Sequence, residues 1–148
     1  MDVVRVCLKK EYDVFEKTEY IFNAQQAVPL FYELIGEGAS ERVACIYLDS
    51  TNKIICCSIV GYGDLRKTNI NLADLFRVAL LSNASNIFIA HNHPTEILIP
   101  TSGDIKWTHE ISHIGSIMGI YLIDSIIIGK NGEYTSIREY VKEGTKNE

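Results

Sequence analysis

The chain has 148 residues, of which 47% are hydrophobic and 22% are charged, and its formal net charge is −5. This balance is typical of a soluble globular chain with one hydrophobic core and argues against a disordered one. The longest apolar stretches, near Ile54–Val60 and Ile120–Ile128, contain polar residues and are too short to span a bilayer. Because an acidic chain lacks the cationic surface that grips phosphates, we expect no direct nucleic-acid binding.

Two further features bear on location. The N-terminus lacks the apolar segment and cleavage site of a secretion signal, so we expect a cytoplasmic protein without membrane association. The cysteines lie in strand-like apolar segments, without the paired short spacings of structural zinc sites. They are Cys7, Cys45, Cys56 and Cys57. We therefore expect buried, reduced thiols.

The first 40 residues predict a strand and a helix. Val3–Leu8 alternates between apolar and other residues as a strand does. Asn23 is a suitable N-cap for a helix from Ala24 to about Ile35. Gly36 and Gly38 should end this helix. Pro29 has no backbone N–H, so it should kink this helix or delay its start.

The middle of the chain predicts a hairpin, a helix and a buried strand. Arg42–Asp49 and Lys53–Gly61 are rich in apolar and β-branched residues and are joined by a short polar turn. Asn71–Leu81 has apolar residues at helical spacing, which indicates an amphipathic helix. The apolar run Ile87–Ala90 suits a strand that is buried on both faces.

A helix and a second hairpin complete the predicted fold. The helix runs from about Ser102 to Met118, with Trp107 as a partly buried packing residue, and two strands follow over Tyr121–Gly129 and Glu133–Ile137. The Asn131-Gly132 pair between these strands is typical of a hairpin turn. Strands and helices in this order predict a single α/β domain, a three-layer α/β/α sandwich around a mixed sheet.

The segment between His91 and Asp104 carries the residues with the clearest chemistry. His91 and His93 stand two positions apart at the end of a strand, so both imidazoles can reach one ion. Asp104, in the first turn of the next helix, can return a carboxylate to the same point. Two histidines, one carboxylate and a water suit a catalytic zinc ion, which lowers the pKa of that water to about 7. We predict one zinc ion per chain.

A hydrolytic site also needs a general base, usually a carboxylate. By proximity in the sequence, Glu96 and Glu110 are candidates, and spacing alone does not choose between them.

A competing zinc motif lies in the following helix. Residues 109–113, HEISH, satisfy HExxH, in which two histidines one helical turn apart bind zinc and Glu110 acts as the base. That motif needs a third ligand downstream, and no histidine follows His113. The remaining candidates are Asp124, Glu133 and Glu139. We therefore favour the first site and expect His109 and His113 to be exposed or half-buried helix residues.

A family resemblance rests on these motifs. Residues 80–94, LLSNASNIFIAHNHP, with PTSGD at 100–104, resemble the JAB/MPN domain of RadC-type bacterial proteins, whose motif is HNHP, a loop and PSxxD. The resemblance covers roughly Ala39 to Ile137, from ERVACIYLDSTNKII through LIDSIIIG. It implies a cytidine-deaminase-like JAB/MPN architecture within a single domain, 1–148, in which 1–38 supply the N-terminal strand and helix.

The resemblance also implies an activity. It makes the chain a zinc-dependent metallopeptidase or isopeptidase of the JAMM type, acting on a peptide or isopeptide substrate, with His91, His93 and Asp104 as metal ligands. Glu41 matches the family's glutamate and is the implied general base. Thr101 stands where the family usually has serine and is implied to donate a hydrogen bond to the oxyanion, a role also open to Ser102.

The chain departs from the family pattern in several places. Thr95-Glu96 follows the HNHP motif where the family often has Ser-Gly, and Asp124-Ser125 stands where the family often has Asp-His. The helix-hairpin-helix segment of full-length RadC proteins is not expected, because the first 40 residues are too few and too acidic. The alternative function is a non-catalytic or DNA-repair-associated accessory module that keeps the JAB/MPN fold.

Overall fold

The computed structural model describes residues 1–14, 17–36, 40–62, 70–93 and 97–146. The strands are β1 (Arg42–Leu48), β2 (Ile54–Tyr62), β3 (Asn86–Asn92), β4 (Tyr121–Ile128) and β5 (Tyr134–Ser136). The α-helices are α1 (Ala24–Phe31), α2 (Leu72–Leu81), α3 (Ser102–Met118) and α4 (Ile137–Lys146). A π-helical turn, η1 (Tyr32–Gly36), and a 3₁₀ turn, η3 (Lys130–Gly132), complete them. None of the described helices is both long and apolar enough to cross a membrane.

The strands form one mixed sheet in the order β2-β1-β3-β4-β5. β1 pairs antiparallel with β2 and β3, β3 pairs parallel with β4, and β4 pairs antiparallel with β5. The parallel pair is the one joined through α3, because a parallel connection needs a long crossover. Both predicted hairpins are present, and Asn131 and Gly132 take the positive φ angles of 56° and 77° that the second turn requires.

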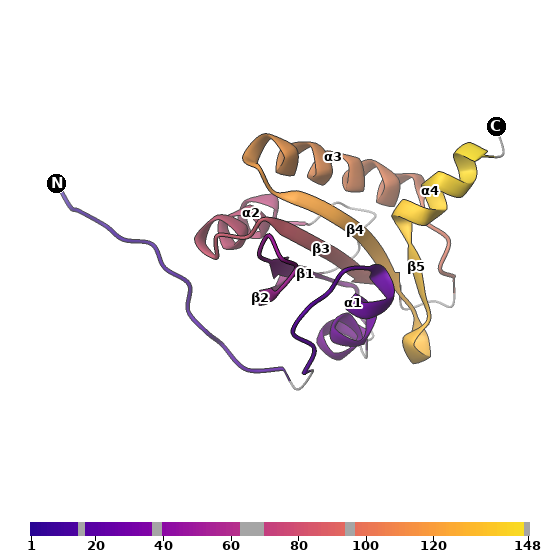
Figure 1. Ribbon diagram of the computed structural model, residues 1–148, viewed down its shortest axis with the longest axis horizontal. Coiled ribbons are helices and arrows are strands. Elements are labelled where there is room, and N and C mark those ends of the chain that lie inside the picture. Colours follow the sequence, from indigo (N-terminus) through magenta and orange to yellow (C-terminus); the bar gives the residue numbers. More distant parts are fainter. Residues whose placement is uncertain (15–16, 37–39, 63–69, 94–96, 147–148) are drawn as a thin grey trace.

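Helices cover both faces of this sheet, as Figure 1 shows. Alternate residues of β1 point to opposite sides, so Ala44 and Ile46 pack with α1 and η1, whereas Cys45 and Tyr47 pack with α2 and α3. Each set belongs to a separate cluster of buried apolar side chains. The predicted three-layer α/β/α sandwich is confirmed.

The first helix begins as predicted and ends differently. Asn23 caps α1, and its side-chain oxygen accepts a hydrogen bond from the backbone N–H of Gln26. Pro29 lies inside the helix, and the chain continues from Tyr32 to Gly36 with the wider winding of a π-helix. The interruption expected from Pro29 is therefore a change of helix type just downstream. Gly38 lies outside the described residues.

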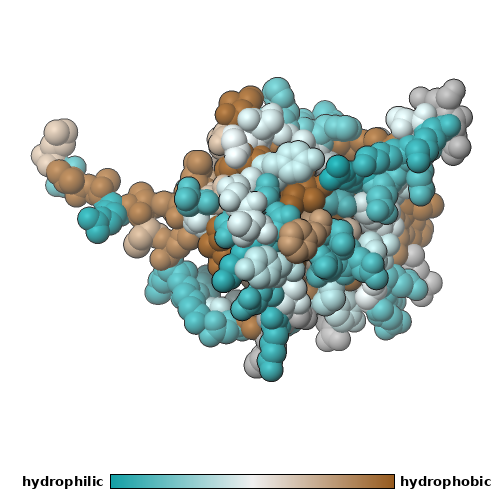
Figure 2. Space-filling model, in the orientation of Figure 1, coloured by the Kyte–Doolittle hydropathy of each residue, from teal (hydrophilic) through white to brown (hydrophobic). Residues whose placement is uncertain are grey.

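The predicted strand at Val3–Leu8 is wrong. This segment is exposed and none of the described residues pairs with it, so Cys7 is exposed rather than buried. Figure 2 shows the apolar side chains of this segment projecting from the body of the molecule. Alternation gives a segment the pattern of a strand, but a strand is stable only when a neighbouring strand or a packed layer completes it.

A buried carboxylate joins β4 to the C-terminal helix, which the sequence pattern did not reveal. Asp124 accepts hydrogen bonds from the backbone N–H groups of Ser125 (2.7 Å) and Arg138 (3.1 Å) and from the hydroxyl of Ser136. Ser136 in turn accepts from the N–H of Glu139, in the first turn of α4. Burial raises the pKa of Asp124, whereas the hydrogen bonds from these donors act to lower it. The ionised carboxylate therefore depends on these hydrogen bonds.

We predict that Asp124→Ala lowers the free energy of unfolding by about 1–3 kcal/mol, because it leaves buried N–H donors without an acceptor. Urea denaturation measures this change. Asp13→Ala is the matched control, since Asp13 is exposed and forms an ion pair with exposed Lys10, and it should change the value by less than about 0.5 kcal/mol. Equal effects of the two substitutions would contradict the structural role of Asp124.

Candidate metal centre

The end of β3 and the start of α3 bring two imidazoles and a carboxylate together. Nε2 of His91 lies 3.0 Å from Nε2 of His93 and 3.3 Å from Oδ1 of Asp104. Nε2 of His93 lies 3.7 Å from Oδ2 of Asp104. One ligand atom from each residue falls within 4.8 Å of the others, an arrangement that can hold a metal ion.

The first turn of α3 fixes the carboxylate. Thr101 is the N-cap, and its hydroxyl accepts a hydrogen bond from the N–H of Asp104 (3.1 Å). Oδ2 of Asp104 accepts in return from the N–H of Thr101 (2.8 Å), which completes a capping box. Asp104 is 4% exposed, so this cap holds the carboxylate inside the protein and directed at the histidines.

His93 is held by the main chain on both sides of the site. Its backbone N–H donates to the carbonyl of Ile128 (3.0 Å), which extends the pairing of β3 with β4 by one residue. Its ring Nδ1 lies 2.9 Å from the carbonyl oxygen of Ile97. Because a carbonyl only accepts, Nδ1 carries the proton and Nε2 presents a lone pair to the site.

Burial and hydrogen bonding set the charges of the other two groups. Burial lowers the pKa of His91, which is 0% exposed, so this imidazole is neutral, as a metal ligand must be. Burial acts to raise the pKa of Asp104, but the hydrogen bond with His91 and those with Thr101 outweigh it and lower that pKa. Two imidazole nitrogens and one carboxylate oxygen are a ligand set that fits Zn²⁺.

Trp107 belongs to this site as well as to the core. Its ring meets that of His91 edge-on, with 5.5 Å between centroids, and its indole N–H points to Oδ1 of Asp104 at 3.5 Å. The sequence predicted Trp107 only as a packing residue. The spacing of three positions from Asp104 on a helix is the signal that places the two side chains on one face.

Asn92 secures the segment that contains Glu41, a role that the sequence did not reveal. Its side-chain oxygen accepts from the N–H of Arg42 (2.6 Å), and its amide nitrogen donates to the carbonyl of Ser40 (3.1 Å). Asn92 is 3% exposed, and these two bonds straddle Glu41. On a strand it points away from His91 and His93, so the motif that supplies the ligands also holds the neighbouring strand.

The remaining candidate site residues differ in exposure and in the groups around them. The hydroxyl oxygen of Thr101 accepts the hydrogen bond of the helix cap from the N–H of Asp104. Ser102, at the first position of α3, is exposed. His109, Glu110 and His113 are exposed on α3, and among the described residues no third ligand joins them. Thr95 and Glu96 lie outside the described residues.

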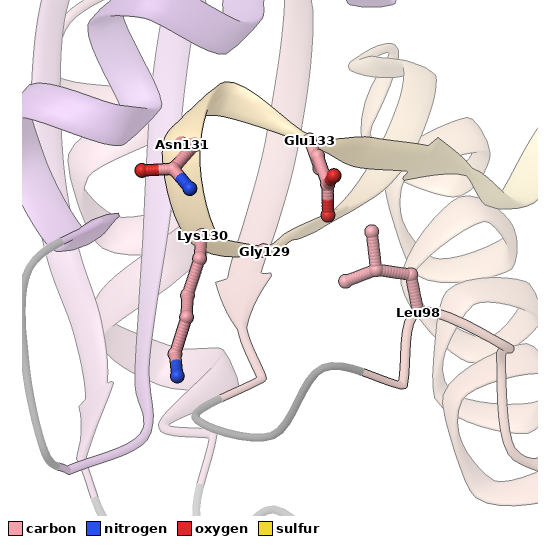
Figure 3. Close-up of a pocket in the computed structure, with 5 residues that line it drawn as sticks. All are labelled: Leu98, Gly129, Lys130, Asn131 and Glu133. Carbon is pink, nitrogen blue, oxygen red and sulfur yellow. The ribbon is translucent and has the colours of Figure 1, made fainter.

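A hollow of about 340 Å³ lies between the segment before α3 and the turn after β4, and none of the ligand residues lines it. It is lined by Leu98, Gly129, Lys130, Asn131 and Glu133. Figure 3 shows the side chains of Leu98 and Glu133 directed into it. A Cβ on Gly129 would lie 2.7 Å from a methyl carbon of Leu98, so the close approach of the two segments suits glycine. Ile97 and Ile128, which anchor His93, are the neighbours of this lining.

The model of the RadC-like JAB domain matches residues 21–144 of the chain. Similar proteins carry the name UPF0758, which states no activity. The protein from Thermosynechococcus vestitus is 37% identical over 101 residues, which is 68% of this chain and 40% of that protein. The protein from Enterococcus faecalis is 37% identical over 117 residues, 79% and 50% of the two chains. The protein from Listeria monocytogenes is 33% identical over 127 residues, 85% and 56%. The chain thus spans about half the length of these relatives.

We predict that Asn92→Ala lowers the free energy of unfolding by about 1–3 kcal/mol, since Asn92 is buried and makes both hydrogen bonds. Hydrogen exchange at the amide of Arg42 should become faster, because its acceptor is lost. The exchange of Ala44, inside the β1–β3 ladder, is the internal control and should change less. An unaltered exchange rate at Arg42 would show that Asn92 does not hold this segment.

Proposed function

The chain belongs to the RadC-like JAB domain family, and from the side chains gathered at the end of β3 we propose that it is a zinc-dependent metallopeptidase or isopeptidase of the JAMM type. The observation that carries the proposal is the convergence of His91, His93 and Asp104, whose ligand atoms lie within 4.8 Å of one another. Two imidazoles and one carboxylate match the ligand set of a zinc ion that keeps a position for water.

The ligand residues divide the work of holding the ion. His91 would bind from the buried floor of the site, and His93 would bind from its rim, where it is partly exposed. Asp104 would close the set from α3. When bound there, zinc would activate a water and polarise the carbonyl of an amide.

Glu41 is the proposed general base. β1 pairs with β3 so that Val43 lies opposite His91, and continuing this register by two residues would bring Glu41 opposite His93. Its charge acts on His91 and favours the protonated imidazole, which agrees with a position close to the ligands. In this role the carboxylate of Glu41 takes a proton from the attacking water and passes it to the leaving amine.

Thr101 is the proposed oxyanion donor. Its hydroxyl oxygen accepts in the cap of α3 beside the ligand Asp104, and in this role its O–H would turn to donate a hydrogen bond to the oxyanion. Ser102 is the neighbouring alternative, because it also carries a hydroxyl at the start of this helix. The substrate proposed from the family resemblance is a peptide or isopeptide, and the proposed location is the cytoplasm.

Metal analysis of purified protein tests the site. We predict one zinc ion per chain in the wild type, loss of zinc in His93→Ala, and full retention in His113→Ala, which removes one exposed histidine of the HExxH motif. The measurement is zinc content by mass spectrometry after dialysis. Loss of zinc from His113→Ala with retention in His93→Ala would show that zinc binds at the HExxH motif instead.

A second substitution tests the activity. In Glu41→Gln, hydrolysis of a quenched fluorogenic peptide library should fall by a factor of about 10²–10⁴, because the base is gone, while zinc content stays at the wild-type level. Glu110→Gln is the matched control and should leave both unchanged. A wild type that binds zinc yet cleaves neither the peptide library nor isopeptide-linked conjugates would instead favour a non-catalytic accessory module.

A further inference from the structure

Two buried polar atoms stand out because they have no hydrogen-bond partner among the described residues. They are Nδ1 of His91 and Oγ of Ser125. Both residues are 0% exposed. A buried polar atom without a hydrogen-bond partner lowers the stability of the fold by about 1–3 kcal/mol. Two such atoms therefore call for a physical explanation.

The sheet places these two residues on neighbouring strands and on the same face. In the parallel pairing of β3 with β4, Ser125 lies opposite Ile89, and His91 is two residues further along β3. Residues two apart on a strand share a face, so Ser125 and His91 are diagonal neighbours. Their face is the one covered by α3, because Ile89 packs in the cluster that contains Trp107.

We propose that Ser125 is a positioning residue for the metal ligand His91, acting through one buried water that bridges its hydroxyl to Nδ1. The two atoms make no direct hydrogen bond, and a water needs polar partners of this kind in order to occupy a protein interior. The proposal rests on the proposed metal site and is independent of whether the chain hydrolyses an amide.

The chemistry of the bridge suits a metal ligand. When Nε2 of His91 binds zinc, Nδ1 carries the proton and needs an acceptor. A serine hydroxyl and a water both donate and accept, so the chain from Nδ1 to Ser125 can take that proton and orient the ring. His93 already has the equivalent anchor, the carbonyl of Ile97. Ser125 thereby gives the buried histidine the partner that the main chain gives the half-buried one.

Zinc affinity of two serine variants tests this role. Competition with a chromophoric chelator should give a zinc dissociation constant about 10–100-fold larger for Ser125→Ala than for the wild type. Ser136→Ala is the matched control: it removes another buried serine hydroxyl, one bonded to Asp124. This control should lower the unfolding temperature of the metal-free protein and leave the dissociation constant unchanged.

A measurement on the wild type keeps the test independent of the variants' folding. In the zinc-loaded protein, nitrogen-15 NMR should show His91 bound through Nε2, with a slowly exchanging proton on Nδ1. Equal zinc affinities in the wild type and Ser125→Ala, or ligation through Nδ1, would overturn the inference while leaving the metal site intact. A wild type that binds no zinc would overturn the metal site and this inference together.

Discussion

The structure around the candidate site depends on one constraint, the burial of the Asp104 carboxylate against two imidazoles. A carboxylate this buried is stable only if hydrogen bonds and nearby polar groups compensate for its lost hydration. The N-cap of α3 supplies one such bond, from Thr101, and His91 and Trp107 supply contacts on the other oxygen. The start of α3 therefore determines both the helix and the position of the third ligand.

The sheet supplies the side chains that face the start of α3. β3 is central in the order β2-β1-β3-β4-β5, so His91 is paired on both edges, and His93 follows the strand with its N–H bonded to Ile128. The intervening Asn92 fastens the chain before β1, which carries Glu41. One strand of seven residues, with the residue that follows it, thus positions both imidazoles and the segment of the proposed base. The positions that serve folding and those proposed for chemistry alternate along it.

Local patterns predicted most of this arrangement. The apolar and β-branched composition of β1 and β2, the helical spacing in α2 and the capping residue Asn23 each act over a few residues, so they can be read from the sequence. The failures involve distant partners. Val3–Leu8 has the pattern of a strand without a neighbour to pair with, and α4 begins where Asp124 and Ser136, on two different strands, meet its first turn. Asn92 and Ser125 likewise gain their significance only from residues on adjacent strands.

The central claim is that His91, His93 and Asp104 form a single metal site. Anomalous diffraction at the zinc absorption edge, from crystals soaked with zinc, tests it most directly. The account predicts one strong peak bonded to Nε2 of His91, Nε2 of His93 and a carboxylate oxygen of Asp104. A peak between His109 and His113, or no peak near the end of β3, would contradict it.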